Sequence, residues 1–345
     1  MSAPAPLRAA LARDQLIAAL READKLVVVT HEHPDGDALG SLIATQLILT
    51  QLGKDSVLYI VDGEFPLPYE YGFLGLPGHI SAPPTDLAER TLVFLDCGNI
   101  DRNPAAAALC IPGAKILNVD HHHDNTRFGT VNHVDAEASC TAEIVWGLMG
   151  ALGAELTPQI AEALYVGLLT DSGSFNYDST SPRSHLMAAE LIAAGIEVHR
   201  IYRRVYEDVP YAKLALLARG LSRVERYDDG RLIVSQLSAE DFAGAAAESS
   251  YSEGVIDHLR AVRDTVMAAL VRDRLDPTGA AELTSDGARV RKVSLRASDD
   301  RVDVSAIARE LGGGGHRAAA GFTTSLAWEP LVAFLRAALE RQLGA

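Results

Sequence analysis

The stretch HEHPDGDALG, which begins at His31, places two imidazoles and three carboxylates within seven residues. It follows the apolar run 26–29 after one threonine, so its acids stand near the end of a segment that should be buried. Carboxylates crowded at such a place repel one another and lose hydration, which raises their pKa unless a cation compensates them. His31, Asp35 and Asp37 are therefore candidate ligands for a divalent cation.

Three further apolar segments end in residues of the same kind. Asp96 ends TLVFLD, Asp120 ends KILNVD and precedes His121 and His122, and Asp171 follows ALYVGLLT. Oxygen and imidazole donors without thiolate suit Mn²⁺ or Mg²⁺ better than structural zinc. Six candidate ligands exceed the need of one mononuclear site, and they fit two cations that lie about 3.5–4 Å apart and share a carboxylate.

Each motif by itself also has an ordinary structural explanation. HPDGD could be a turn into a helix, with Asp37 near the helix start, where negative charge is favourable. Asp96 could end a strand, and a short histidine run is often a solvated loop. Four acids after four apolar segments would need four separate explanations of this kind, so metal binding is the favoured interpretation.

The elements that must position these residues alternate between strands and helices. Strands rich in Val, Ile and Leu that alternate with helices predict an α/β fold, with a parallel sheet covered by helices on both faces. Loops at the carboxyl edge of such a sheet open into a crevice. Pro34 and Gly36 are read as turn formers. The expected strands are 26–29, 57–61, 91–97 and 115–120, and the expected helices are 39–53, 139–152, 158–169 and 182–194.

The pattern changes after Gly195, which predicts a second domain. We expect a catalytic α/β domain at 1–195, a charged helical linker at 196–222 and a smaller α/β domain at 223–345. In the second domain we expect a hairpin turn at 228–230, strands near 265–271 and 289–296, and a closing helix at 328–343.

The second domain contains GGGGH, which ends at His316. Glycines let backbone N–H groups approach an anion closely, and a helix after them would add its positive end. Arg296 could add a forked contact to a phosphate. A flexible surface turn is the alternative. The candidate substrate-binding residues are Arg296, Gly313, Gly314, Gly315, His316 and Arg317.

Composition limits the classes of function. The chain has 345 residues and a formal net charge of −15, whereas a protein that grips long nucleic acid by its phosphates needs a basic surface. The sequence therefore favours a small substrate or a local basic patch. No apolar stretch approaches the roughly 18–20 residues of a membrane span, and three widely spaced cysteines argue against a disulfide scaffold. We expect no secretory signal, no membrane partner and a cytoplasmic location.

The quoted motifs carry a family resemblance. HEHPDGDALGS, FLDCG, VDHHHDN and LLTDSGSF, in this order, resemble the four motifs of the DHH phosphoesterase superfamily. VDVSAIARELGGGGHRAAAG resembles the glycine-rich signature of the associated C-terminal domain. The two-domain length is similar to that of the nanoRNase and pAp-phosphatase group. Asn176 and Tyr177 stand where members often have an arginine, which leaves one substrate contact unassigned.

The resemblance implies a role for each site residue. Asp120 would orient an imidazole, and His122 would donate a hydrogen bond to a phosphate oxygen. The implied metal ligands are His31 and Asp35 for one cation, Asp37, His121 and Asp171 for the other, and Asp96 as the bridge.

The implied activity is hydrolysis of phosphoester bonds by a metal-activated water, with Mn²⁺ preferred and Mg²⁺ as the alternative. The expected substrates are short RNA or DNA oligonucleotides, cut to nucleoside 5′-monophosphates, and 3′-phosphoadenosine 5′-phosphate (pAp). One substrate end would rest on the glycine loop and the scissile phosphate on the metals. The alternatives are a cyclic- or linear-dinucleotide phosphodiesterase and a metal-dependent nucleotide sensor without turnover. A monomer and a homodimer both stay open.

Overall fold

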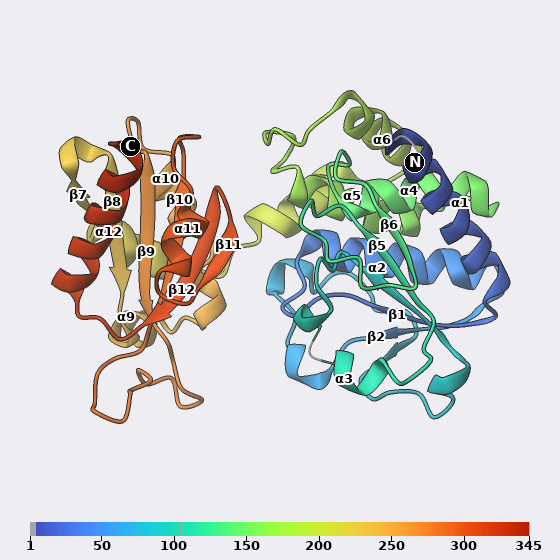
Figure 1. The fold of residues 1–345 in the computed structure, drawn as a ribbon, viewed down its shortest axis with the longest axis horizontal. Helices are drawn as coiled ribbons and strands as arrows, with labels where there is room; N and C mark the ends of the chain where they lie inside the picture. The colour runs from blue at the N-terminus through green and yellow to red at the C-terminus, as the bar shows by residue number, and fades with distance from the viewer. Residues whose placement is uncertain (1–4, 104, 345) are drawn as a thin grey trace. The chain divides into compact units, whose positions relative to one another are not determined.

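The computed structural model describes residues 5–103 and 105–344, and it describes their side chains except at 5–9 and 316. The chain divides into two compact units, Met1–Asp208 and Val209–Ala345. The division falls within the segment 196–222, where the sequence predicts a linker. In Figure 1 the first unit runs from blue to yellow-green and the second from yellow to red.

The first unit is built on a six-stranded parallel sheet with the order β3-β2-β1-β4-β5-β6 (Figure 1). The predicted parallel α/β fold is thereby confirmed. The strand order reverses between β1 and β4, and ligands of open α/β sheets bind at such a reversal, beyond the carboxyl ends of the strands. The strands are β1 (Lys25–Val29), β2 (Asp55–Tyr59), β3 (His79–Ile80), β4 (Thr91–Leu95), β5 (Ile116–Asp120) and β6 (Val131–Val134).

The two faces of this sheet are covered unequally. Successive strand residues point to opposite faces, so Leu26 and Val28 join one core cluster and Val27 and Val29 another. The second face is packed by α3 (Ala106–Leu109) and neighbouring loop residues. On the first face, three longer helices lie against the strands: α1 (Ala5–Glu22), α2 (Gly36–Gln51) and α4 (Thr141–Leu152). Two more helices, α5 (Pro158–Asp171) and α6 (Pro182–Ala193), pack on these helices and extend the same core cluster.

Close packing of α2 against α5 explains the glycines of the first motif. A Cβ on Gly36 would lie 2.4 Å from Oγ1 of Thr170, and a Cβ on Gly40 would lie 2.4 Å from the carbonyl oxygen of Ala163. Reading Gly36 as a turn former was wrong, because it is the first residue of α2. The two glycines remove the bulk that would hold α5, and Asp171 at its end, away from α2.

The second unit has its own six-stranded sheet, with the order β11-β12-β10-β9-β8-β7. Its pairs are antiparallel except for β8 and β9, which are parallel. The expected hairpin turn joins β7 to β8 at Asp228–Gly230. The strands are β7 (Glu225–Tyr227), β8 (Leu232–Leu237), β9 (Met267–Asp273), β10 (Arg291–Ala297), β11 (Gly314–His316) and β12 (Ala319–Thr324).

The remaining helices complete both units. In the first, α7 (Val198–Tyr202) runs into a π-helical turn at Arg203–Glu207. The helices of the second unit are α8 (Tyr211–Ser222), α9 (Ala239–Ala245), α10 (Val255–Arg260), α11 (Val304–Arg309) and α12 (Trp328–Leu343).

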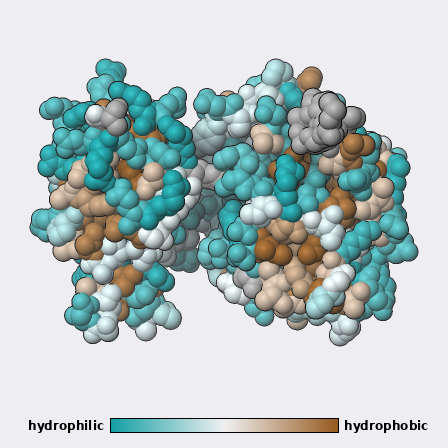
Figure 2. Space-filling model, in the orientation of Figure 1, coloured by the Kyte–Doolittle hydropathy of each residue, from teal (hydrophilic) through white to brown (hydrophobic). Residues whose placement is uncertain are grey.

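The surface is mostly hydrophilic, with smaller apolar patches on the visible face of each unit (Figure 2). Large apolar side chains with high exposure include Leu186 on α6, at 64%, and Tyr211 on α8, at 83%. Among the described residues, none of the helices has both the length and the hydropathy that crossing a bilayer requires.

Candidate metal centre

The candidate metal ligands lie on four segments at one edge of the first sheet. His31 follows β1, Asp96 follows β4, His121 follows β5, and Asp171 is the last residue of α5. β1 and β4 are the neighbours between which the strand order reverses. Segments that are 140 residues apart in the sequence thus meet where the topology opens a crevice.

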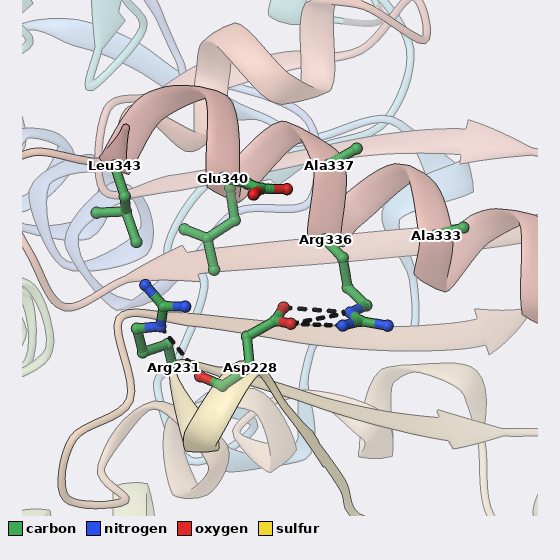
Figure 3. A pocket seen from close by; sticks show the side chains of 8 residues that line it. Asp228, Arg231, Ala333, Arg336, Ala337, Glu340 and Leu343 are labelled. Carbon is green, nitrogen blue, oxygen red and sulfur yellow. Dashed lines mark hydrogen bonds and ion pairs between the residues drawn. The ribbon is translucent and has the colours of Figure 1, made fainter. Parts of the chain in front are cut away.

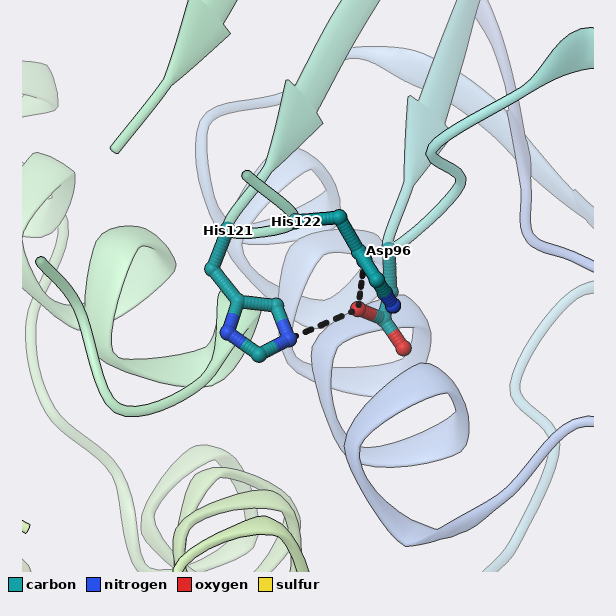
Figure 4. A group of neighbouring side chains, drawn as sticks. All are labelled: Asp96, His121 and His122. Atoms are coloured by element: carbon teal, nitrogen blue, oxygen red, sulfur yellow. Dashed lines mark ion pairs between the residues drawn. The ribbon is translucent and has the colours of Figure 1, made fainter. Parts of the chain in front are cut away.

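Asp96 lies at the centre of the cluster. Its Oδ2 is 3.5 Å from Nε2 of His31, and its Oδ1 is 3.6 Å from Nε2 of His121. Oδ1 is also 3.7 Å from Nδ1 of His122, and Figure 4 shows both neighbouring imidazoles directed at this carboxylate. Asp96 has a φ of 55°, a left-handed conformation that is rare outside glycine and that concentrates at functional sites.

Three groups of side chains each place one potential ligand atom per residue within 4.8 Å of the others. Two of them have the membership that the resemblance implies for two cation sites, with Asp96 in the first. Asp96 and His121 each belong to two groups, which joins all six predicted ligands into one cluster. The groups are His31, Asp35 and Asp96; Asp37, His121 and Asp171; and Asp96, His121 and His122.

Backbone donors hold two of the carboxylates. Asp35 caps α2, and its Oδ1 accepts hydrogen bonds from the N–H groups of Asp37 and Ala38. Asp37 is 1% exposed, and it accepts from the N–H groups of Thr141 at 2.7 Å and Ala142 at 2.9 Å, at the start of α4. The structural explanation of HPDGD as a turn into a helix is therefore correct, since Asp37 lies in the first turn of α2. The capping by Asp35 is compatible with metal binding, because a carboxylate has two oxygens.

The electrostatics of the cluster indicate negative charge in need of compensation. Burial, followed by the charges of Asp96, Asp171 and Asp35, raises the pKa of Asp37 well above its usual value. Burial raises the pKa of Asp171 to about 7, against the opposing influence of His121. The pKa of Asp96 lies below its usual range: burial opposes this, but the hydrogen bond to His31 and the nearby imidazoles outweigh it. Divalent cations would compensate the excess.

The donor set fits a divalent cation. Nδ1 of His31 lies 2.6 Å from the carbonyl oxygen of Glu32, so it donates there, and a bound cation that displaced the proton of Nε2 would find a lone pair on the atom that faces Asp96. The three groups contain carboxylate oxygens and imidazole nitrogens and no thiolate. Such donors suit Mn²⁺ or Mg²⁺.

His122 is held by Asp120, as the resemblance implies. Nδ1 of His122 lies 2.8 Å from Oδ1 of Asp120, and Asn125 donates to Oδ2 of the same carboxylate at 2.6 Å. Burial lowers the pKa of His122, but the hydrogen bond to Asp120 and the charges of Asp96 and Asp120 raise it to about 9. A cationic imidazole at neutral pH suits donation to a phosphate oxygen.

Sequence reasoning missed two residues beside the cluster. Thr141, the first residue of α4, binds Asp37 through its N–H and donates from Oγ1 to Oδ1 of Asp96 at 3.0 Å. Arg102 lies in the turn after Asp96. Neither stands in a charged motif, so the sequence gives no signal for Thr141 and a weak one for Arg102, an arginine six residues after a candidate ligand. Asn176 donates to the carbonyl oxygen of Gly173 and so supports the loop after Asp171.

In the second unit, register relates Arg296 to the glycine run. Arg296 on β10 pairs with Ala319 on β12, which pairs with His316 on β11. The side chain of His316 lies outside the described residues. Arg296 donates to the carbonyl oxygen of Leu295 at 3.1 Å, and Arg317 donates to that of Asp300. Their substrate-binding roles stay predictions.

The glycine run has packing reasons of its own. A Cβ on Gly313 would lie 2.2 Å from the carbonyl oxygen of Gly321, and one on Gly315 would lie 2.6 Å from that of Ala319. No helix follows the run directly, so no helix end adds positive charge there: Gly314 and Gly315 belong to β11, and α11 precedes the run. Glycine at these positions lets β11 pack against β12. Gly314 differs, because a Cβ there would meet nothing within 4 Å.

A pocket lies in the C-terminal unit, between α12 and the β7–β8 turn (Figure 3). Arg336 is directed at Asp228 and binds both carboxylate oxygens, at 2.6–3.2 Å. Arg231 donates to the carbonyl oxygen of Asp228. The two arginines of the lining are matched by two carboxylates, Asp228 and Glu340, so the lining as a whole offers no excess positive charge to an anion. It is lined by Asp228, Arg231, Ala333, Arg336, Ala337, Leu339, Glu340 and Leu343.

The fold and the cluster define a phosphoesterase of the DHH type, and comparisons with known proteins agree. Residues 25–168 match the DHH family N-terminal domain, and residues 229–344 match the DHHA1 domain. The chain belongs to the DHH family and is a hydrolase that acts on phosphoester bonds.

Individual proteins similar to this chain have more specific names than the family does. The chain is 33% identical to the bifunctional oligoribonuclease and PAP phosphatase NrnA of Thermus thermophilus, over 86% of this chain and 83% of that one. It is 23% identical to NrnA of Bacillus subtilis, over 90% and 92%. A crystal structure of an exopolyphosphatase-related protein from Bacteroides fragilis has the same fold, with a TM-score of 0.83, 24% identity and 96% coverage of both chains.

Proposed function

We propose that this protein hydrolyses short oligonucleotides to nucleoside 5′-monophosphates and removes the 3′-phosphate of pAp, with two divalent cations held by His31, Asp35, Asp37, Asp96, His121 and Asp171. The observation that carries the proposal is the convergence of these side chains into groups whose ligand atoms lie within 4.8 Å. The names of the NrnA relatives, oligoribonuclease and PAP phosphatase, support the substrate class.

The side chains around the cluster would divide the work. Bound divalent cations would supply Lewis acidity, which lowers the pKa of water and offsets phosphoryl charge. Asp120 holds the imidazole of His122, which would donate a hydrogen bond to a phosphoryl oxygen as negative charge develops there. Burial raises the pKa of the Cys97 thiol, beside Asp96, to about 12, so this thiol stays protonated and is a poor nucleophile. Direct attack by water is therefore favoured over a covalent intermediate.

In the second unit, we propose that Arg296, the glycines of 313–315, His316 and Arg317 bind the substrate away from the scissile phosphate. Two observations support this. Arg296 and His316 share one row across the β10-β12-β11 ladder, and Gly314 presents backbone with open space above its Cα. Backbone N–H groups at such a place can contact an anion.

Mn²⁺ is the proposed cation, with Mg²⁺ as the alternative. Both accept carboxylate and imidazole donors. A solved structure of exonuclease RecJ bound to manganese shares the fold, with a TM-score of 0.51. Cytoplasmic location and action as a monomer or homodimer remain predictions from the sequence.

The test is hydrolysis of a labelled pentaribonucleotide and of pAp by the full chain with Mn²⁺. We expect mononucleotide products, loss of activity in chelator and recovery when Mn²⁺ is added back. Asp96→Ala should lower kcat/KM by about a thousandfold with the fold intact by circular dichroism, because it removes the carboxylate shared by two ligand groups. Lys115→Gln serves as the control. It removes a positive charge next to the amino end of β5, and the cluster lies beyond the carboxyl end of the same strand. Activity that persists in chelator would refute the proposal.

A further inference from the structure

Arg102 stands between two of the loops that carry the candidate ligands. It ends the short 3₁₀ turn Ile100–Arg102, which follows β4 and Asp96. Its carbonyl oxygen accepts a 2.6 Å hydrogen bond from the N–H of Glu32, the residue after His31. The next residue, Asn103, is buried and donates to the carbonyl oxygen of Thr30. The carbonyl oxygen of Arg102 and the side chain of Asn103 together hold this turn against the end of β1.

Arg102 is half-buried, and its guanidinium has no partner in the part of the chain that the structure describes. Among the described residues, its side chain has no hydrogen bond or ion pair, although the protein has 46 acidic residues and most of its half-buried arginines bind one. Arg90 and Arg289, for example, each bind two carboxylates. The position of Arg102 is nevertheless beside the cluster, because its turn begins four residues after Asp96 and is hydrogen-bonded to Thr30 and Glu32, the residues on either side of His31.

The charge of the cluster explains why such a cation would matter. The six candidate ligands include four carboxylates, so two divalent cations would leave the ligand set electrically neutral. His122 is paired with the buried Asp120, which offsets its charge. Attraction for an anionic phosphate must then come from a further positive group, and a guanidinium presents donors that match two phosphate oxygens.

We propose that Arg102 contacts the phosphate that the cluster hydrolyses. This inference rests on the proposed function, and it assigns Arg102 to the bound phosphate and not to the metals. If Arg102 bound no phosphate, its positive charge beside the cluster would only lower the affinity for metal, because it repels cations.

The experiment compares Arg102→Gln, Arg102→Lys and the wild type, with Lys115→Gln as the control. Lys115 makes an exposed ion pair with Glu22, before the amino end of β5, so its loss removes the same charge from the opposite edge of the same sheet. Thermal unfolding confirms the fold of each variant. Among the described residues, the Arg102 side chain makes no hydrogen bond or ion pair that the fold would lose, and the lysine variant keeps the charge if glutamine proves unstable.

Three quantities are measured: kcat/KM for the pentaribonucleotide with Mn²⁺, the affinity of the Mn²⁺-loaded protein for adenosine 5′-monophosphate, and the affinity for Mn²⁺. We expect Arg102→Gln to lower kcat/KM about a hundredfold and to weaken nucleotide binding, with Mn²⁺ affinity unchanged or higher. Arg102→Lys should keep part of the wild-type kcat/KM and part of the nucleotide affinity. Lys115→Gln should match the wild type in all three quantities.

Two results would overturn the inference while the proposed function stands. One is wild-type kinetics in Arg102→Gln, and the other is a loss of activity matched by an equal loss of Mn²⁺ affinity, which would place Arg102 in the support of the metal site. If the wild type cleaves no oligonucleotide, the proposed function fails, and nucleotide binding decides about Arg102. In that case, the inference about Arg102 would be overturned if wild type and Arg102→Gln bound adenosine 5′-monophosphate equally well, or if neither bound it.

Discussion

The ligand cluster of the first unit and the glycine run of the second both stood out in the sequence, but they differ in what the structure adds. In the cluster, every predicted ligand belongs to a group of close donor atoms, and structural duties such as the capping by Asp35 coexist with that placement. In the run, packing against β12 already accounts for Gly313 and Gly315. Charged residues after buried strands are therefore stronger evidence of a functional site than glycines are, because close backbone packing can by itself explain a glycine.

The largest effect is expected from a change in the helix packing that supports the cluster. Gly40→Ala would place a Cβ 2.4 Å from a backbone oxygen of α5, so α5 must move and carry Asp171 with it. We expect a loss of about 1–3 kcal/mol in the free energy of unfolding, measured with urea, and a larger proportional loss of kcat/KM.

Gly150→Ala in α4 is the matched control, because its Cβ would meet nothing within 4 Å. Alanine there should leave activity unchanged and stabilise the protein by up to about 1 kcal/mol. If Gly40→Ala behaved like Gly150→Ala, glycine in α2 would have no part in assembling the cluster.

Thr141 provides a smaller test inside the cluster. Thr141→Val keeps the N–H that Asp37 accepts but removes the hydroxyl that donates to Asp96. Removing a group that orients a ligand costs about tenfold or more in metal affinity, which we expect to see in a Mn²⁺ titration. Thr141→Ser restores the hydroxyl and should restore the affinity. Equal losses in both variants would mean that the methyl packing, and not the hydrogen bond, is what matters.

The smallest expected effect separates packing from binding in the glycine run. Gly314→Ala meets open space, so stability should not change, whereas a substrate phosphate against this backbone would be hindered. We expect a several-fold rise in the dissociation constant of a short oligonucleotide, measured with the catalytically inactive Asp96→Ala protein. Gly313→Ala should instead lower the melting temperature. Unchanged binding in Gly314→Ala would leave the run with a packing role alone.

The sequence by itself determined the elements and the chemistry of the site. Apolar runs predicted β1, β2, β4 and β5 but not the edge strands β3 and β6. The acids and histidines near the ends of apolar segments gave all six ligand candidates, because burial leaves few reasons for charge at those points. The tertiary structure decided the rest. Gly36 and Gly40 serve a helix crossing, Thr141 joins the cluster from 45 residues beyond Asp96, and part of the glycine run forms strand β11. Contacts of this kind depend on which surfaces meet after folding, and neither composition nor local periodicity encodes the partner.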